Sequence, residues 1–211
     1  MIRFEIITIF PNIFKGFLEE SLIARGQKKK IIKINLHNLR NWTNDKHKTV
    51  DDRPFGGGPG MVLKVEPILK TVKSLKTKDK KKKKRVILFS PRGKKFTQND
   101  ARRLSKYDQL IFICGRYEGT DERVADFIAD EIISIGSYVL NGGEVATMVL
   151  IEAIARLVPG FIAKAESTRK VDHAQYTRPE SIEITGKKRR VPKVLLSGNH
   201  RKISEWRKAN K

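Results

Sequence analysis

Glycine, acidic and aromatic residues gather in short segments of this 211-residue chain, where they could hold a ligand. In residues 51–61, two adjacent acids, Asp51 and Asp52, precede four glycines in five positions. Glycine lets a backbone approach a ligand closely and adopt a positive φ. No Gly-Lys-Ser/Thr follows and no strand leads directly into the segment, so it fits neither a phosphate loop nor a dinucleotide fingerprint. A flexible loop is the alternative, and the two acids favour a binding role.

A second segment, residues 114–123, combines Arg, Tyr, Glu and Asp side chains with two glycines after an apolar run. A capped helix start with solvated ion pairs would explain Asp121 and Glu122. It would not explain Tyr117 and Glu118, which stand between the two glycines. These two side chains are therefore candidates for contact with a substrate.

A third segment, residues 134–144, carries three glycines around Tyr138 and Leu140. Its backbone could wrap a flat ring and offer N–H and C=O groups to an adenine, with these two side chains as apolar walls. Further along, residues 175–179, 195–200 and 206–207 mix basic, aromatic and amide side chains. That mixture suits phosphates and unstacked bases.

Elements that would position these segments alternate between strand and helix patterns. The opening order of strand, helix, strand indicates a parallel sheet with crossover helices. Three successive strands end in loops rich in Gly or Pro, and ligands bind beyond the carboxyl ends of such strands. The expected strands span residues 2–9, 31–36, 86–89, 109–114 and 131–135, and the expected helices span 13–23, 66–75, 99–105, 121–128 and 144–157.

From residue 159 the pattern changes, and we expect an appendage rather than a second full domain. Residues 160–185 look irregular, 191–196 would be a short strand or extended segment, and 203–208 a short basic helix. The lysine-rich residues 77–85 favour an exposed connection, with an RNA contact as the alternative.

The formal net charge of +22 and the pI of about 10.2 predict binding to polyanions, of which RNA is one. The single cysteine, Cys114, excludes an intrachain disulfide and a four-Cys zinc site, and its apolar surroundings indicate a buried thiol. The four histidines show no metal-ligand spacing. No run approaches the roughly 18 apolar residues of a membrane span, and the N-terminus does not resemble a signal peptide, so we expect a cytoplasmic protein without a membrane partner.

Taken together, the segments resemble the bacterial tRNA (guanine-N1)-methyltransferases, the TrmD family of the SPOUT superfamily. The resemblance covers about residues 1–207, and its specificity comes from the order in which the motifs follow one another. These motifs are residues 51–61, Ser90-Pro91 with Gly93, 114–124, 133–144, 176–179 and 195–200.

The resemblance implies an α/β fold of SPOUT type, in which a parallel sheet flanked by helices carries a C-terminal trefoil knot. A small, truncated helical appendage would follow. Residues 1–160 would form the methyltransferase domain with the knot, 161–175 an interdomain linker and 176–211 a short tRNA-binding appendage. The enzyme would be a homodimer with its active sites at the subunit interface.

The implied reaction moves a methyl group from S-adenosylmethionine to N1 of guanine 37 in tRNA, next to the anticodon. By position, the resemblance assigns the methyl donor to Pro91, Gly115, Ile135, Gly136, Ser137, Tyr138, Val139 and Leu140. It assigns the tRNA substrate to Asp52, Tyr117, Glu118, Arg178 and Asn199. Mg²⁺ is used by some family members, but the sequence shows no site for a metal.

Guanine N1 carries a proton at neutral pH, so the reaction needs a base and a group that stabilises charge on O6. Arg156 falls on the family's arginine, with a helix C-terminal role as the alternative. The family's catalytic Asp has no direct counterpart. Aligning Ser167 with the family serine places Glu166 in the base position, and Asp172 matches a second family acid.

Other departures from the family are Ser137 in place of Asp, Arg92 in place of Gln, and a chain that stops at Lys211 where relatives continue. They keep two alternatives open. One is a catalytically weakened paralogue that binds RNA, and the other is a related methyltransferase that acts on a ribose 2′-OH or another base.

Overall fold

The computed structural model describes residues 1–76, 79, 81–162 and 173–210. The chain divides into two compact units, Met1–Lys164 and Ala165–Lys211. Among the described residues, no helix is both long and apolar enough to cross a lipid bilayer.

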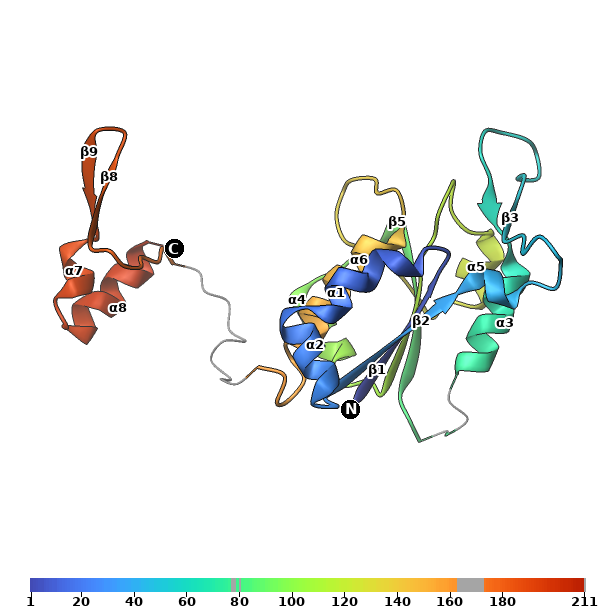
Figure 1. Ribbon diagram of the computed structural model, residues 1–211, viewed down its shortest axis with the longest axis horizontal. Helices are drawn as coiled ribbons and strands as arrows, with labels where there is room; N and C mark the ends of the chain where they lie inside the picture. The colour runs from blue at the N-terminus through green and yellow to red at the C-terminus, as the bar shows by residue number, and fades with distance from the viewer. Residues whose placement is uncertain (77–78, 80, 163–172, 211) are drawn as a thin grey trace. The chain divides into compact units, whose positions relative to one another are not determined.

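A five-stranded sheet runs through the first unit in the order β2-β1-β6-β5-β7, with every neighbouring pair parallel (Figure 1). The central strands are apolar on both faces, as a sheet covered by helices on both sides requires. The predicted α/β class with a parallel sheet is therefore confirmed. The strands are β1 Ile2–Thr8, β2 Ile32–Asn38, β5 Lys84–Lys95, β6 Gln109–Ile113 and β7 Glu131–Ser134.

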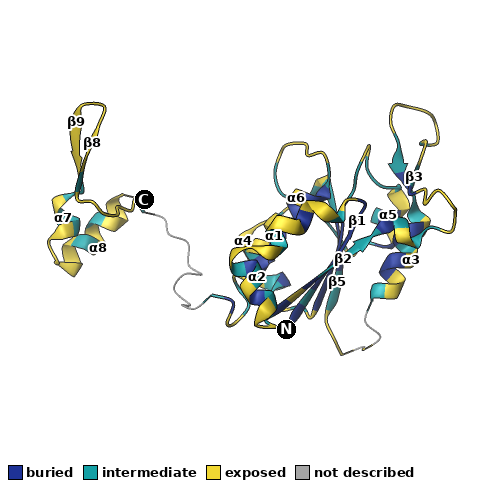
Figure 2. Cartoon of the chain, viewed as in Figure 1, coloured by how far each residue is buried: buried dark blue, intermediate teal, exposed yellow. Residues whose placement is uncertain are grey.

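Helices cover both faces of this sheet and create two apolar clusters (Figures 1 and 2). Phe4 and Phe112 pack with α2, α4 and α6 on one face, while Ile68 of α3 and Val124 of α5 pack on the other. The helices are α1 Lys15–Glu19, α2 Ser21–Lys28, α3 Val65–Leu75, α4 Gln98–Leu104, α5 Glu122–Phe127 and α6 Gly143–Ala155, with 3-10 turns η1 Pro11–Phe14 and η2 Leu39–Trp42.

The single helix predicted over residues 13–23 is wrong in detail. Glu20 is extended, with φ −113° and ψ 155°, and separates α1 from α2. The second helix then continues past Gly26 to Lys28. A Cβ on Gly26 would lie 2.5 Å from the ring of Phe161, so this glycine permits close packing rather than ending the helix.

Residues 41–60, predicted to be a loop, contain a short paired segment. Strand β3, Asp51–Asp52, pairs antiparallel with β4, Val62–Leu63, so the glycine-rich stretch is the closed end of a two-stranded ribbon. Gly56, Gly57, Gly58 and Gly60 all have positive φ. The ribbon fixes the two ends of this loop, while Gly56, Gly57 and Gly58 have open space around them.

The second unit contains more regular structure than its sequence predicts. Strand β8, Ser181–Ile184, lies within the stretch 160–185 predicted to be irregular, and it forms an antiparallel hairpin with β9, Lys187–Arg190. Thr185 and Gly186 both take positive φ at the turn. The prediction of a short strand or extended segment at 191–196 is wrong for residues 193–196, which form helix α7, Lys193–Leu196. The predicted basic helix is longer, α8 His200–Ala209, and Asn199 caps its N-terminus.

Candidate functional site

The carboxyl ends of β6 and β7 and a bulge in β5 surround a cavity of about 630 Å³. Strand β5 lies between the other two, so its residues 90–93 and the loops that follow β6 and β7 converge. The three segments predicted to point at one shared site therefore do meet, although the first of them lies inside β5 and not at its end. This edge of the sheet lies beside the amino end of α6 (Figure 1).

The first wall of the cavity comes from an irregularity inside β5. The sequence predicts that this strand ends at Phe89, but β5 continues to Lys95. Phe89 and Lys94 both pair with Ile133, so residues 90–93 are extruded from the ladder as a bulge. Ser90, Pro91 and Arg92 line the cavity as a result.

The second wall, residues 115–119, is tied to the neighbouring segments by backbone hydrogen bonds. Gly143 N donates to Gly115 O over 3.0 Å, and Glu118 N donates to Met61 O over 3.0 Å. The glycine at 143 is required, because a Cβ there would lie 2.7 Å from Cys114 Cα. These contacts place Tyr117 and Glu118 on the cavity wall, next to the glycine-rich ribbon.

The third wall is the segment that follows β7. Its apolar side chains are unusually open for their type, with Tyr138 55%, Val139 85% and Leu140 38% exposed. Tyr138 donates a 3.2 Å hydrogen bond to Ile135 O and lies against Gly136. Of the eight residues predicted to bind the donor, Ser137 does not line this cavity. The other seven do: Pro91, Gly115, Ile135, Gly136, Tyr138, Val139 and Leu140.

A buried carboxylate below the cavity was not predicted from the sequence. Glu144, at the start of α6, is 1% exposed and accepts hydrogen bonds from Thr8 Oγ1 at 2.7 Å and Arg116 Nε at 2.9 Å. The Arg116 guanidinium also lies 4.9 Å from the ring centre of Phe10. The sequence signal that could have indicated this buried acid is its position, directly after two glycines and at the start of an apolar helix. The contact fixes the loop after β6 against α6.

Cys114 is buried beside the same helix, as its apolar surroundings predicted. Burial and the neighbouring Glu144 carboxylate raise the pKa of the Cys114 thiol. Its sulfur lies 3.2 Å from Thr147 Oγ1. A thiol that stays protonated and buried has a packing role rather than a nucleophilic one.

An ion pair connects two walls of the cavity. Arg92 Nη2 lies 2.6 Å from Glu122 Oε2, and both side chains line the cavity while remaining well exposed. Exposed pairs of this kind contribute little to stability, about 0–1 kcal/mol.

Three of the five predicted substrate contacts belong to the first unit, where they line two adjoining cavities. Tyr117 and Glu118 line the cavity described above, while Asp52 lines a second cavity of about 1170 Å³ that shares Thr120 and Glu122 with the first. A backbone N–H from Arg53 and the Lys64 ammonium lower the pKa of Asp52. Arg178 and Asn199 belong to the second unit, where both are exposed.

The predicted catalytic residues are only partly covered by the structure. Arg156 is exposed and forms the C-cap of α6, where its N–H donates to Glu152 O over 3.3 Å. Glu166 and Asp172 lie outside the described residues. Within the described ranges, no group of three or more His, Cys, Asp and Glu side chains could hold a metal ion.

Comparison with known proteins gives a consistent result. The sequence model of the family described as tRNA (Guanine-1)-methyltransferase TrmD matches residues 2–211. A tRNA (guanine-N(1)-)-methyltransferase of Dictyoglomus turgidum is 50% identical over 99% of this chain and 84% of the relative. Proteins of the same name from Thermomicrobium roseum and Carboxydothermus hydrogenoformans are 46% and 47% identical, over 98% of this chain and 77% and 81% of the relatives.

Proposed function

Because this chain belongs to the tRNA (guanine-N1)-methyltransferase family, we propose that it methylates N1 of guanine 37 in tRNA, next to the anticodon, with S-adenosylmethionine as donor. The observation that carries this proposal is the convergence of two strand ends and the β5 bulge on one cavity, lined by seven of the eight residues expected to bind the donor. A protein that only bound RNA would have no need of such a cavity.

The cavity suits the donor in size and chemistry. Its volume of about 630 Å³ lies within the roughly 300–1,000 Å³ of small-molecule sites. The open Tyr138, Val139 and Leu140 side chains would cover the two faces of an adenine. The glycines at 115 and 136 bring main-chain groups to the cavity wall, where they can hydrogen-bond the ring edge. S-adenosylmethionine, once bound, supplies a methyl group already activated by its sulfonium.

The remaining chemistry belongs to the protein. Guanine N1 must lose its proton before it can attack, and negative charge then grows on O6. We assign the base to Glu166 or Asp172, with Glu166 as the first choice because it follows the alignment with Ser167. Arg156, at the carboxyl end of the helix whose other end meets the cavity, would stabilise the charge on O6.

Contact with tRNA is proposed for both units. Tyr117 and Glu118 lie on the cavity wall, and Asp52 lies in the adjoining cavity, so these residues could hold guanine 37 and its neighbour. In the second unit, residues 176–211 would act as the tRNA-binding appendage, with Arg178 and Asn199 as contacts. The hairpin there carries four consecutive exposed cations, Lys187 to Arg190, which suit the phosphate backbone.

A homodimer is supported by the surface of α6. Val145 and Val149, one helical turn apart, are 52% and 42% exposed, and Phe10 and Ile13 are 42% and 45% exposed. An exposed apolar surface that could cover the same surface on a second copy favours a two-fold dimer. The active site would then lie at the subunit interface.

The fold proposed for residues 1–160 is a SPOUT domain with a trefoil knot, and 161–175 would be the linker. Support comes from the close pairing of residues 115–116 with 142–143, which brings the segment after β7 back to the end of β6. We propose the cytoplasm as the place of action, because the substrate tRNA is there.

The test is methylation of a tRNA transcript that carries guanine at positions 36 and 37. Purified protein and S-adenosylmethionine should yield 1-methylguanosine at position 37, detected by mass spectrometry of the digested RNA. A transcript with adenine at 37 is the control. If the guanine transcript stays unmodified while calorimetry detects donor binding, the target is another RNA position. If no donor binds, the chain is an RNA-binding paralogue.

The base is tested by comparing Glu166→Gln with Asp172→Asn. The true base should lose rate by about 10²–10⁴-fold while the dissociation constant of S-adenosylmethionine stays nearly unchanged. If neither substitution slows turnover, the assignment of the base to this segment is wrong.

A further inference from the structure

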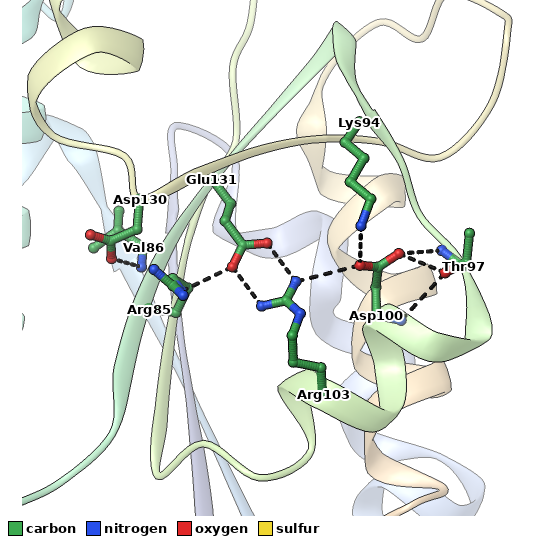
Figure 3. A network of polar contacts seen from close by, with 8 residues as sticks. All are labelled: Arg85, Val86, Lys94, Thr97, Asp100, Arg103, Asp130 and Glu131. Carbon is green, nitrogen blue, oxygen red and sulfur yellow. Dashed lines mark hydrogen bonds and ion pairs between the residues drawn. The ribbon is translucent and has the colours of Figure 1, made fainter.

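A network of ionic side chains lies beside the cavity without lining it (Figure 3). Its centre is Asp100 of α4, whose side chain is 6% exposed. Lys94 Nζ donates to its Oδ1 over 2.7 Å, and Thr97 Oγ1 and N donate to its Oδ2 over 2.6 Å and 3.1 Å. With Thr97, Asp100 forms the capping box at the start of α4, and its bond to Lys94 connects this helix end to β5.

Lys94 is the residue at which β5 rejoins its partner strand. Before the bulge, Phe89 pairs with Ile133, and after it Lys94 pairs with the same residue. Gly93 passes so close to β7 that a Cβ there would lie 2.7 Å from the Ile132 carbonyl carbon. The extruded segment between these two points provides Pro91 and Arg92 to the cavity wall.

We propose that Asp100 is a positioning residue of the donor pocket. By holding Lys94, it fixes the point where β5 returns to the sheet, and thereby the width and direction of the bulge that carries Pro91 and Arg92. This inference rests on the proposed function, because it assumes that the cavity binds S-adenosylmethionine.

A second connection, through Arg103, also keeps α4 in place, although Arg103 Nη2 donates a long 3.5 Å hydrogen bond to Asp100 Oδ1 as well. Arg103, on the same helix, donates to both carboxylate oxygens of Glu131 at the start of β7, over 2.7 Å and 2.6 Å. Arg85 Nε of β5 lies 2.9 Å from Glu131 Oε1, an ion pair whose angle does not satisfy a hydrogen bond. Ala101 and Leu104 of α4 are also fully buried. A protein that lacks the Asp100 charge should therefore still fold with α4 on the sheet.

Asp100 is ionised at neutral pH. Burial acts to raise its pKa, but the hydrogen bonds from Lys94 and Thr97 and the Lys94 charge outweigh it and lower the pKa to about 2. The connection between Asp100 and the bulge is therefore a charged one at neutral pH.

The test is a double-mutant cycle on Lys94 and Asp100. Asp100→Asn keeps an acceptor for Thr97 and removes the charge, while Lys94→Met keeps most of the stem and removes the ammonium. Each single variant should raise the dissociation constant of S-adenosylmethionine about threefold to fivefold, and the double variant should match the singles because one interaction is lost. The KM for the donor should rise together with this dissociation constant, while the KM for tRNA and kcat should stay within about twofold of the wild-type values.

Two control variants separate this role from general destabilisation. Arg102→Met removes an exposed cation of the same helix that bonds only Asn99 among the hydrogen bonds described, and should leave donor affinity unchanged. Lys94→Arg retains the charge and should recover most of the affinity. Circular dichroism confirms folding, and Lys94→Met, at an exposed residue, remains informative if Asp100→Asn does not fold.

Three results would overturn the proposal: donor affinity unchanged in Lys94→Met, effects of the two substitutions that add, or an equal rise in the KM for tRNA. If the wild-type protein itself binds no S-adenosylmethionine, the proposed function fails and this inference fails with it. If the wild type binds the donor and the variants bind it equally well, the inference alone is wrong.

Discussion

The two units of the chain differ in what holds them together. In the first, apolar side chains are buried on both faces of the sheet, whereas in the second no described residue between 173 and 210 is buried (Figure 2). The first unit therefore has a core that fixes its shape. The second depends on a tight turn, helix caps and local hydrogen bonds.

The same contrast extends to binding. The first unit closes three loops around a cavity, which suits a small molecule with defined edges. The second presents exposed cations on a two-stranded hairpin, which suits contact with RNA phosphates that does not depend on the base sequence. The difference indicates that donor binding and tRNA grip can be changed separately.

The largest effect is expected from separating the units. A chain that ends after Lys164 keeps the whole sheet and the cavity, so its dissociation constant for S-adenosylmethionine should stay within about threefold of the full chain. It loses the proposed tRNA contacts of the second unit and both candidate bases, so methyl transfer should fall at least about 1,000-fold. Calorimetry measures the dissociation constant, and an assay with a radiolabelled methyl group measures the rate of methyl transfer. A shortened chain that keeps a tenth of the activity would contradict the division of labour.

The next effect concerns stability. Glu144→Gln leaves Arg116 largely buried without its partner, so the free energy of unfolding should fall by about 3 kcal/mol. Glu183→Gln, on the exposed hairpin, should change it by less than about 0.5 kcal/mol. Urea unfolding followed by circular dichroism compares the two. Equal losses at both sites would mean that the second unit has a core of its own.

A smaller effect is expected on tRNA affinity. Replacing Lys187 and Arg189 by Ser should raise the tRNA KM about tenfold at physiological salt and lower the slope of log affinity against log salt by about 2. Donor affinity should not change. The matched pair Lys28→Ser and Lys33→Ser removes two exposed cations from the first unit. If that pair weakens tRNA binding equally, the hairpin has no special part in it.

The smallest effect is a pH dependence in the first unit. The pKa of Asp100 is about 2 in the folded protein, against about 3.9 for an unperturbed Asp. A carboxylate whose pKa is lowered by folding stabilises the folded protein at pH values above its unfolded pKa. This stabilisation is lost as the pH falls through the folded pKa. The difference in unfolding free energy between wild type and Asp100→Asn should therefore shrink between about pH 4 and pH 2.

Because solvent reaches Lys94, that difference should not exceed about 1 kcal/mol. The exposed pair of Arg201 and Glu205 in the second unit provides the comparison, and Glu205→Gln should change stability little at any pH. A difference for Asp100→Asn that stays constant down to pH 2 would contradict the lowered pKa.

Much of the fold and of the cavity could be predicted from local patterns. Buried parallel strands read as continuous apolar runs, and the glycines after β6 and β7 mark the strand ends at which ligands bind. For that reason the amino-acid sequence alone predicts that Gly115 and Gly136 share one site. Asp121, expected to cap a helix, accepts a hydrogen bond from Arg123 N.

What could not be predicted depends on contacts between distant residues. Pro91 predicts the end of a strand, since proline cannot donate to the ladder, but β5 pairs with β7 again from Lys94 onward, after the bulge. The bond between Thr8 and Glu144 spans 136 positions. The β8–β9 hairpin lacks the usual alternation, because four cations occupy its second strand.

The glycine at 143 has a consequence for inhibition. An adenine mimic bound in the proposed donor pocket would contact the Tyr138, Val139 and Leu140 side chains and the main chain at residues 115 and 136, and a resistance substitution within the pocket would have to fill its space with a new side chain. At Gly143 even a methyl group would meet the backbone of Cys114, and at Gly136 it would meet the ring of Tyr138. Substitutions there that reject the drug should also reject the donor, which leaves few routes to resistance within this pocket.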